Sequence, residues 1–210
     1  MMKKIIELVF LVLLLSTSSY ADNIKDFKIE KISIGHSALE YFTESQLEGG
    51  ELDWFNYSYK EYSTSLLPGQ GIYDWFKISY KSEDDKFIIE GLVGIVLKKN
   101  YDDDKCNKEL DTTALKISKL FKSTKRGKKK LYRVIYNSRK IFQEPNSSGK
   151  SVVSSISFDF ENEGKIILSC YDMDTATNQI DSPIKDINQF DTFRIDIRSK
   201  VFKNYLEKVI

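Results

Sequence analysis

The chain has 210 residues, of which 41% are hydrophobic and 13% aromatic, enough apolar side chains to build a proper core. Lysine and arginine total 32 against 31 for aspartate and glutamate, and this balance argues against a dedicated nucleic-acid binder, whose affinity rests on a basic surplus. With only three prolines and no low-complexity tract, the composition also excludes a disordered chain.

The first 21 residues have the three parts of a secretory signal peptide. Lys3 and Lys4 precede the apolar run Leu8–Leu15, and small residues follow it at the expected cleavage site. A membrane-spanning helix needs roughly 20 apolar residues, so an uncleaved anchor is the less favoured alternative. We expect residues 1–21 to be removed and residues 22–210 to form a single domain in the periplasm or outside the cell. No cysteine lies at the cleavage site, so no lipid attachment is expected.

The stretch Ile32–Phe42 resembles the strand-turn-helix setting of a catalytic serine, because Gly35, His36 and Ser37 stand between a strand-like run and an apolar segment. A Ser-His-Asp triad needs a histidine from elsewhere in the chain, yet the only histidine is the immediate neighbour of the serine. Ser37 and Glu40 have instead the Ser-x-x-Glu spacing of a capping box. We therefore expect a helix cap here and no nucleophile.

Aromatic side chains gather in the next segment and form a candidate binding platform. If exposed, such a platform would stack on sugar rings or contact a partner protein, and if turned inward it would be part of the core. The sequence leaves both interpretations open. The residues are Trp54, Phe55, Tyr57 and Tyr59, followed later by Trp75.

Three segments alternate apolar and polar residues, the pattern of a strand with one buried face. The turn Glu-Asn-Glu-Gly follows the second of them, which predicts a β-hairpin with the segment beyond. Residues 86–99 are apolar on both faces and contain Gly91 and Gly94, so we expect a central strand that another element approaches closely. The residues expected to face inward are Phe76, Ile78, Tyr80, Ile156, Phe158, Phe160, Phe193, Ile195 and Ile197.

Two helices are predicted, from Asp104 to Lys122 and from Val201 to the C-terminus, because apolar residues recur there at intervals of three and four. Cys106 lies on the apolar stripe of the first helix, and Cys170 lies in the strand of the predicted hairpin. Two cysteines in an exported chain are expected to pair, which would fasten this helix to the sheet. A zinc site or redox motif is disfavoured, since one histidine and two distant cysteines cannot supply four ligands.

The segment after the first helix is strongly basic and forms a candidate anion patch for lipid or another polyanion. The alternative is a solvated loop whose charges repel one another. The acidic stretch that begins at Asp172 lacks the glycine and the glutamate of an EF-hand, so no metal site is expected. The patch comprises Lys125, Arg126, Lys128, Lys129 and Lys130.

Three segments, Ile29–Leu47, Cys106–Phe121 and Asp191–Leu206, are similar to a group of uncharacterised exported bacterial proteins without an assigned activity. The first also resembles the opening of small α+β outer-membrane assembly lipoproteins of the SmpA/OmlA type, in which an Ile-x-x-Gly turn starts a helix. The lipidated cysteine of that family is absent here. These resemblances imply export and an α+β architecture, and they do not imply a substrate.

Strands in hairpins with few helices predict an α+β fold, a mainly antiparallel sheet with two or three helices packed on one face. We expect an exported protein that binds an envelope protein or a glycan rather than nucleic acid, without a cofactor or an integral membrane segment. The alternative is a hydrolase that uses carboxylates or a Ser-Lys pair, since carboxylates distant in sequence can meet in space. No residue is put forward as catalytic.

Overall fold

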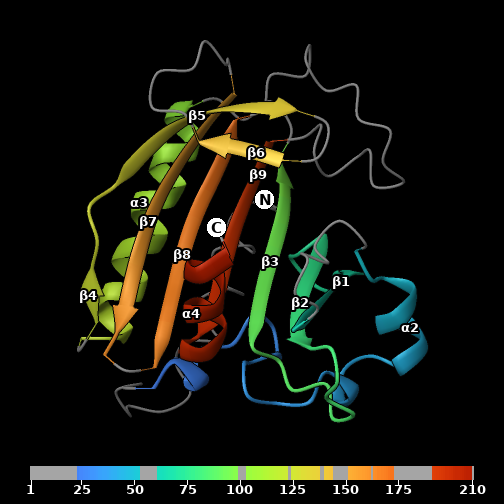
Figure 1. Cartoon of the computed structure of the whole chain (residues 1–210). Coiled ribbons are helices and arrows are strands. Elements are labelled where there is room, and N and C mark those ends of the chain that lie inside the picture. The colour runs from blue at the N-terminus through green and yellow to red at the C-terminus, as the bar shows by residue number, and fades with distance from the viewer. Residues whose placement is uncertain are drawn as a thin grey trace.

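The computed structural model describes residues 23–52, 61–98, 103–122, 124–137, 140–143, 151–161, 163–172 and 191–209 (Figure 1). The predicted signal peptide lies outside these ranges. The strands are β1 (Tyr62–Pro68), β2 (Trp75–Lys81), β3 (Gly91–Lys98), β4 (Lys125–Arg126), β5 (Lys130–Asn137), β6 (Lys140–Gln143), β7 (Ser151–Phe160), β8 (Gly164–Asp172) and β9 (Asp191–Ser199). The helices are η1 (Ile24–Asp26), η2 (Ala38–Glu40), α2 (Glu44–Gly49), α3 (Asp103–Leu120) and α4 (Lys200–Val209). None of these helices combines the length and the apolarity needed to cross a membrane.

The strands form one antiparallel sheet in the order β1-β2-β3-β9-β8-β7-β5-β6, with β4 paired to β7. The predicted hairpin is β7–β8, in which Ile156 lies opposite Leu168. β3 lies in the interior of the sheet, between β2 and β9, as its two apolar faces predicted. The α+β class and the antiparallel sheet are thereby confirmed.

One face of the sheet, which we call the α3 face, carries the main core. All nine side chains predicted to face inward are buried, and they share this face because antiparallel partners point to the same side. α3 contributes the stripe predicted from its spacing, and every member of that stripe is at most 3% exposed. The stripe consists of Cys106, Leu110, Ala114, Ile117 and Phe121.

A disulfide joins Cys106 of α3 to Cys170 of β8, with the two Cα atoms 5.8 Å apart. Cys170 shares the α3 face with Ile166 and Leu168, and all three side chains are fully buried. The bridge spans 64 residues of sequence and fastens α3 to the centre of the sheet, as predicted.

Two glycines of β3 allow other elements to approach the sheet, and they do so on opposite faces. A Cβ on Gly94 would lie 2.5 Å from the ring of Tyr73 and 2.8 Å from Ile29, both in the core of the α3 face. A Cβ on Gly91 would lie 2.5 Å from the ring of Phe202 in α4. The close approach predicted for this strand is confirmed at both positions.

α4 therefore packs on the face opposite to α3, and we call this second side the α4 face. Gly91 alternates with Leu92, which is buried on the α3 face, so the ring of Phe202 must lie on the other side. Tyr62 of β1 joins it there, with ring centroids 5.0 Å from Phe202 and 4.7 Å from Tyr205. Figure 1 shows α4 in front of the sheet and α3 behind it. In this respect the fold differs from the expectation of helices on one face, since an apolar stripe does not specify the side on which it is buried.

Candidate functional site

The corner between the N-terminal strand-like run and η2 is built around Ser37. Gly35 takes a φ of +82°, a conformation that favours glycine, and Ser37 is the N-cap of η2. The Ser37 hydroxyl donates to the carbonyl of Lys86 at 2.6 Å and accepts from the Leu39 amide at 3.2 Å. Both hydrogen-bonding roles of the hydroxyl are thus used structurally, which argues against a nucleophile.

Glu40 does not close the capping box that the Ser-x-x-Glu spacing predicted. Its Oε2 lies 3.3 Å from Nδ1 of His36, and the two side chains are 54% and 46% exposed. η2 is a single 3₁₀ turn, in which the third residue does not stand over the N-cap as it does in an α-helix. The reciprocal capping box lies one turn later, between Thr43 and Gln46 of α2.

A shallow depression of about 410 Å³ surrounds this corner. Its titratable groups lie at the surface, and the described residues contain no group of three His, Cys, Asp or Glu side chains that could hold a metal ion. We therefore interpret the corner as a structural joint. The depression is lined by Gly35, His36, Ser37, Leu39, Glu40, Asp85, Lys86 and Ile88.

Of the candidate binding platform, only Trp75 belongs to the described part of the chain. The residues outside it are Trp54, Phe55, Tyr57 and Tyr59. Trp75 begins β2 on the α4 face and is half-buried against a small apolar cluster of Leu52, Leu66 and Ile95. Its ring thus contributes to packing on this face.

The candidate anion patch lies along β4 and the start of β5. Lys125 and Arg126 form β4 on the edge of β7, where both side chains are exposed. The ammonium of Lys129 is used internally, at 2.8 Å from Asp111 Oδ2 and 3.2 Å from Asn107 Oδ1 in α3. The two remaining members, Lys128 and Lys130, are exposed. One of the five cations is therefore neutralised by the helix next to it.

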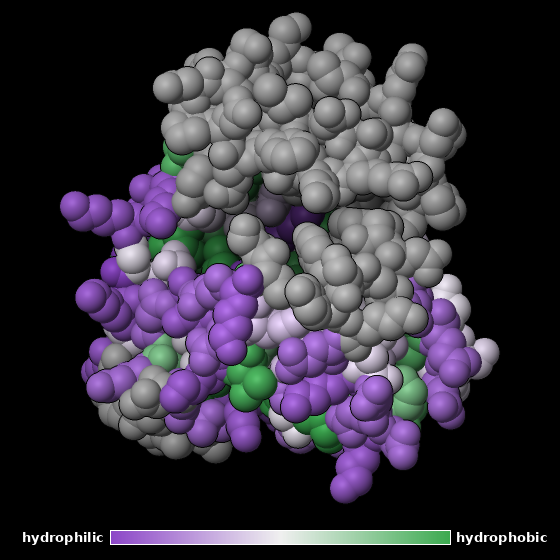
Figure 2. Space-filling model, viewed as in Figure 1, coloured by the Kyte–Doolittle hydropathy of each residue, from purple (hydrophilic) through white to green (hydrophobic). Residues whose placement is uncertain are grey.

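The middle of the α4 face carries four ionisable side chains, which we call the charged cluster: Lys77 of β2 and Arg194, Asp196 and Arg198 of β9. Lys77 pairs with Val93 and Val93 pairs with Asp196, so the two ionisable residues lie in one row across the sheet. Arg194 and Arg198 stand two residues to either side of Asp196 and share its face. Figure 2 views the molecule from this side and shows mainly hydrophilic residues, with smaller apolar patches, over its lower half.

Each guanidinium of the charged cluster has a defined partner. Arg198 donates from Nε to Oδ2 of Asp196 at 2.9 Å and pairs with the same oxygen through Nη2, and the two side chains are 28% and 17% exposed. Burial is the largest single influence and lowers the pKa of Arg198, but the charge and hydrogen bond of Asp196, with Tyr171 and Glu207, together raise it. Arg194 donates from Nε to Thr192 Oγ1 at 3.0 Å, and its guanidinium lies 3.9 Å from the ring centre of Tyr171.

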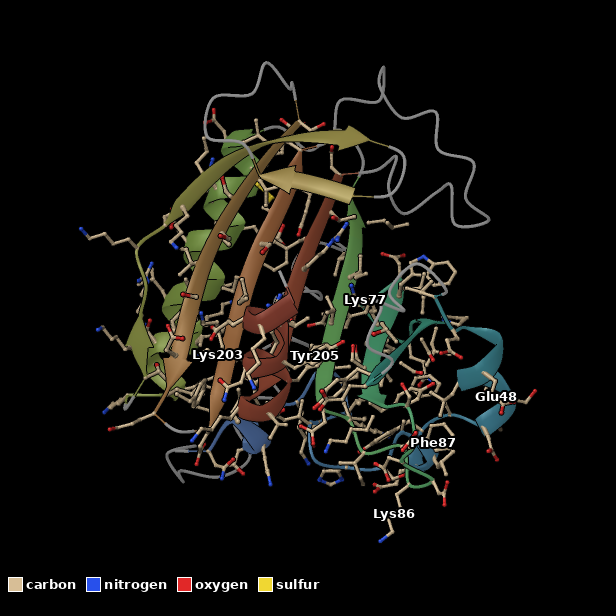
Figure 3. All side chains as sticks on the ribbon, viewed as in Figure 1. Glu48, Lys77, Lys86, Phe87, Lys203 and Tyr205 are labelled. Atoms are coloured by element: carbon tan, nitrogen blue, oxygen red, sulfur yellow. A yellow bond between two sulfur atoms is a disulfide. The ribbon has the colours of Figure 1, made fainter. Side chains whose placement is uncertain are left out.

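Lys77 lies within β2, opposite Val93 of the neighbouring strand β3, and is half-buried (Figure 3). The pKa of its ammonium is lowered to about 8. Burial is the largest cause, Arg194 and Arg198 also lower it, and Asp196 raises it. The lowered pKa therefore reflects mainly the desolvation of the amine. Such perturbed groups gather at functional sites more often than elsewhere on proteins.

Sequence alternation alone does not reveal the charged cluster. The alternation in β9 identifies the buried residues Phe193, Ile195 and Ile197 and assigns the residues between them to a solvated face. Three charges in five residues, at positions 194, 196 and 198, are the one local indication. The partner of this strand in the cluster, Lys77, is more than 100 residues away in sequence and becomes a neighbour only through β3.

No protein-family model matches this chain, and no curated protein or solved structure matches it. The resemblances noted from the sequence therefore stay predictions.

Proposed function

We propose that the protein is an exported binding domain and that its ligand contacts the α4 face of the sheet. The observation that carries this proposal is the charged cluster of Lys77, Arg194, Asp196 and Arg198, held partly buried at the middle of a sheet. Apolar side chains of similar size at such positions are often as stabilising as a buried ion pair or more so. Their cost to stability makes recognition the best account of these charges.

Two features support export. Lys3 and Lys4 followed by the apolar run Leu8–Leu15 are typical of a signal peptide. The disulfide between Cys106 and Cys170 suits an oxidising compartment, in which such bonds form and persist. The partner we propose is accordingly a protein or a glycan of the cell envelope or its surroundings.

Binding is favoured over hydrolysis by the way the candidate groups are used. The Ser37 hydroxyl both donates and accepts within the fold, and the Asp196 carboxylate is paired with Arg198. A hydrolase that uses carboxylates needs two of them on either side of the bond to be cleaved. In the charged cluster, only one carboxylate faces three cations.

The location of the binding face is tested by site-specific photo-crosslinking in cells that produce the protein. A photoreactive residue at Ser155 or Ser157, which point to the α4 face from β7, is expected to capture a partner. The same residue at Leu115, 54% exposed on the outer side of α3, serves as the matched control. Equal capture from both faces, or capture from Leu115 alone, would refute the proposed face. N-terminal sequencing of this protein, purified from the same cells, tests export, since its mature chain is expected to begin near Asp22.

A further inference from the structure

We propose that the charged cluster binds an oxyanion, a carboxylate or phosphate group of the ligand, and that Arg194 is the residue that contacts it directly. This inference rests on the proposed function and adds the chemistry of the ligand. It is carried by the geometry of Arg194 and by the lack of a carboxylate paired with its guanidinium among the described residues.

Arg194 is held in place from two sides. Its Nε donates to Thr192 Oγ1 at 3.0 Å, and its guanidinium plane lies over Tyr171 at 3.9 Å from the ring centre. Thr192 is fully buried and Tyr171 half-buried, so both supports belong to the packed part of the sheet. The terminal nitrogens Nη1 and Nη2 have no acceptor among the described residues. A guanidinium with a fixed orientation and two unused donors matches the paired oxygens of a carboxylate or phosphate.

Hydroxyl groups continue the row that begins at Arg194. Across the sheet, Arg194 of β9 is paired with Ser169 of β8, and Ser169 is paired with Ser155 of β7. All three residues therefore project from the α4 face along one line, with neighbouring strands about 4.8 Å apart. A serine hydroxyl can donate a hydrogen bond to an oxyanion. Ser169 is buried and Ser155 is half-buried, so Ser155 is the more accessible of the two donors.

The charge of the cluster selects an anion over a cation. Within the cluster, Lys77, Arg194 and Arg198 surround one carboxylate, Asp196, and Arg198 already occupies Oδ2 of that carboxylate. Glu207 of α4 acts on Arg198 as well, so Arg198 is the better compensated of the two arginines. The guanidinium of Arg194 is therefore left without a carboxylate of its own in the cluster. A cationic ligand would meet repulsion here, whereas an oxyanion would relieve the repulsion among the cations.

The test measures binding of inorganic phosphate and of glucuronate to the purified, disulfide-bonded protein by NMR titration of backbone amides. We expect millimolar affinity and the largest shifts in β8 and β9. R194Q is expected to weaken binding about tenfold or more, since one charge-assisted pair of hydrogen bonds is lost. R194K keeps the positive charge but loses the paired N–H donors of the guanidinium, so we expect a smaller loss of affinity than in R194Q. D196N releases Arg198 and is expected to strengthen binding.

R126Q is the matched variant, because Arg126 is an exposed arginine of the candidate anion patch and its replacement changes net charge equally. Unchanged affinity in R126Q with loss in R194Q and R194K supports the inference. Loss in R126Q instead, or unchanged affinity in R194Q, would overturn it. A preference for phosphate over glucuronate, or the reverse, indicates which oxyanion the ligand carries.

Folding and function are separated within the same experiment. Amide spectra that match the wild type show that R194Q and R194K are folded. If R194Q does not fold, the affinity of the conservative variant R194K decides the outcome. If neither phosphate nor glucuronate binds while crosslinking at Ser155 captures a partner, the oxyanion site is wrong and the binding domain stands. If the anions bind but no partner is captured, the oxyanion site stands and the proposed partner is wrong.

Discussion

The two faces of the sheet use the same strands for different purposes. In β9, Phe193, Ile195 and Ile197 point into the core beneath α3, while Arg194, Asp196 and Arg198 point to the α4 face. The α3 face is closed by a long helix and a disulfide, and the α4 face is closed in part by a short helix on aromatic side chains. The comparison indicates that stability is concentrated on one side, which leaves the other side free to carry charges that cost stability.

The largest expected loss of stability comes from a substitution in the core of the α3 face. Phe158 is fully buried there, and Phe158→Ala is expected to lower the free energy of unfolding by about 3–5 kcal/mol through lost transfer energy and a cavity. Ser157→Ala, on the adjacent residue of the α4 face, is the matched control and is expected to change it by less than about 1 kcal/mol. Urea unfolding measures both. Similar losses in the two variants would contradict the division between the faces.

The disulfide gives the next largest effect. Replacing Cys106 and Cys170 together by serine removes a link across 64 residues and is expected to cost about 2–4 kcal/mol, chiefly because the unfolded chain gains entropy. Reduction of the wild-type protein provides the control, since it breaks the same bond without changing the sequence. A midpoint of unfolding unaffected by either treatment would show that the bridge does not stabilise α3 on the sheet.

A substitution of Lys77 measures how much a charge on the α4 face lowers the stability of the protein. Its pKa of about 8 in the folded protein lies below the ordinary 10.5, so folding disfavours the proton, and wild-type stability is expected to rise as pH increases from about 8 to 10.5. Below pH 8 the penalty is complete. Lys77→Met is therefore expected to stabilise the protein at pH 7, by at most about 3 kcal/mol.

Urea unfolding at pH 7 and at pH 10 measures the effect of Lys77→Met, with Lys81→Met as the control because Lys81 is an exposed lysine of the same strand. The gain from Lys77→Met is expected to shrink at pH 10, where the wild-type amine is neutral in the fold. A gain that does not depend on pH would show that packing rather than charge causes it. Asp196, Arg194 and Arg198 are the charged groups that act on the amine.

The smallest expected effect lies at the corner on Ser37. Ser37→Ala removes the bonds to the Leu39 amide and the Lys86 carbonyl and is expected to cost about 1 kcal/mol. His36→Ala is the comparison, because the exposed pair with Glu40 is worth less than about 1 kcal/mol. Thermal unfolding measures both variants. Loss of an esterase activity in Ser37→Ala at unchanged Tm would contradict the structural role.

Much of the α3 face is predictable because its determinants are local. Alternation in a strand places every second residue on one side, and the spacing of three and four places Cys106, Leu110 and Ala114 on one side of α3. Both patterns are fixed by backbone geometry and need no knowledge of the partner. The disulfide was predictable because each of the two cysteines lies on the apolar side of its element and the chain is expected to enter an oxidising compartment.

The candidate site escapes such prediction because it depends on strand order. Lys77 and Asp196 become neighbours only because β3 pairs with β2 on one edge and β9 on the other. Glu40 has the spacing of a capping box, but the turn is 3₁₀ and the carboxylate pairs with His36 instead. In both cases the final contact depends on a choice among partners that local sequence leaves open.

The sequence by itself determined the class of fold, the strands β2, β3, β7, β8 and β9, the two longer helices and the residues that these elements bury on the α3 face, since each follows from a short-range period of apolar side chains. The tertiary structure alone decided that α4 lies opposite α3. An amphipathic helix must bury its apolar side, but either face of a sheet can receive it, and here Gly91 leaves room for Phe202. The order of the strands also brought Lys77 to the three charges of β9, because side chains remote in sequence interact only when the sheet sets their separation.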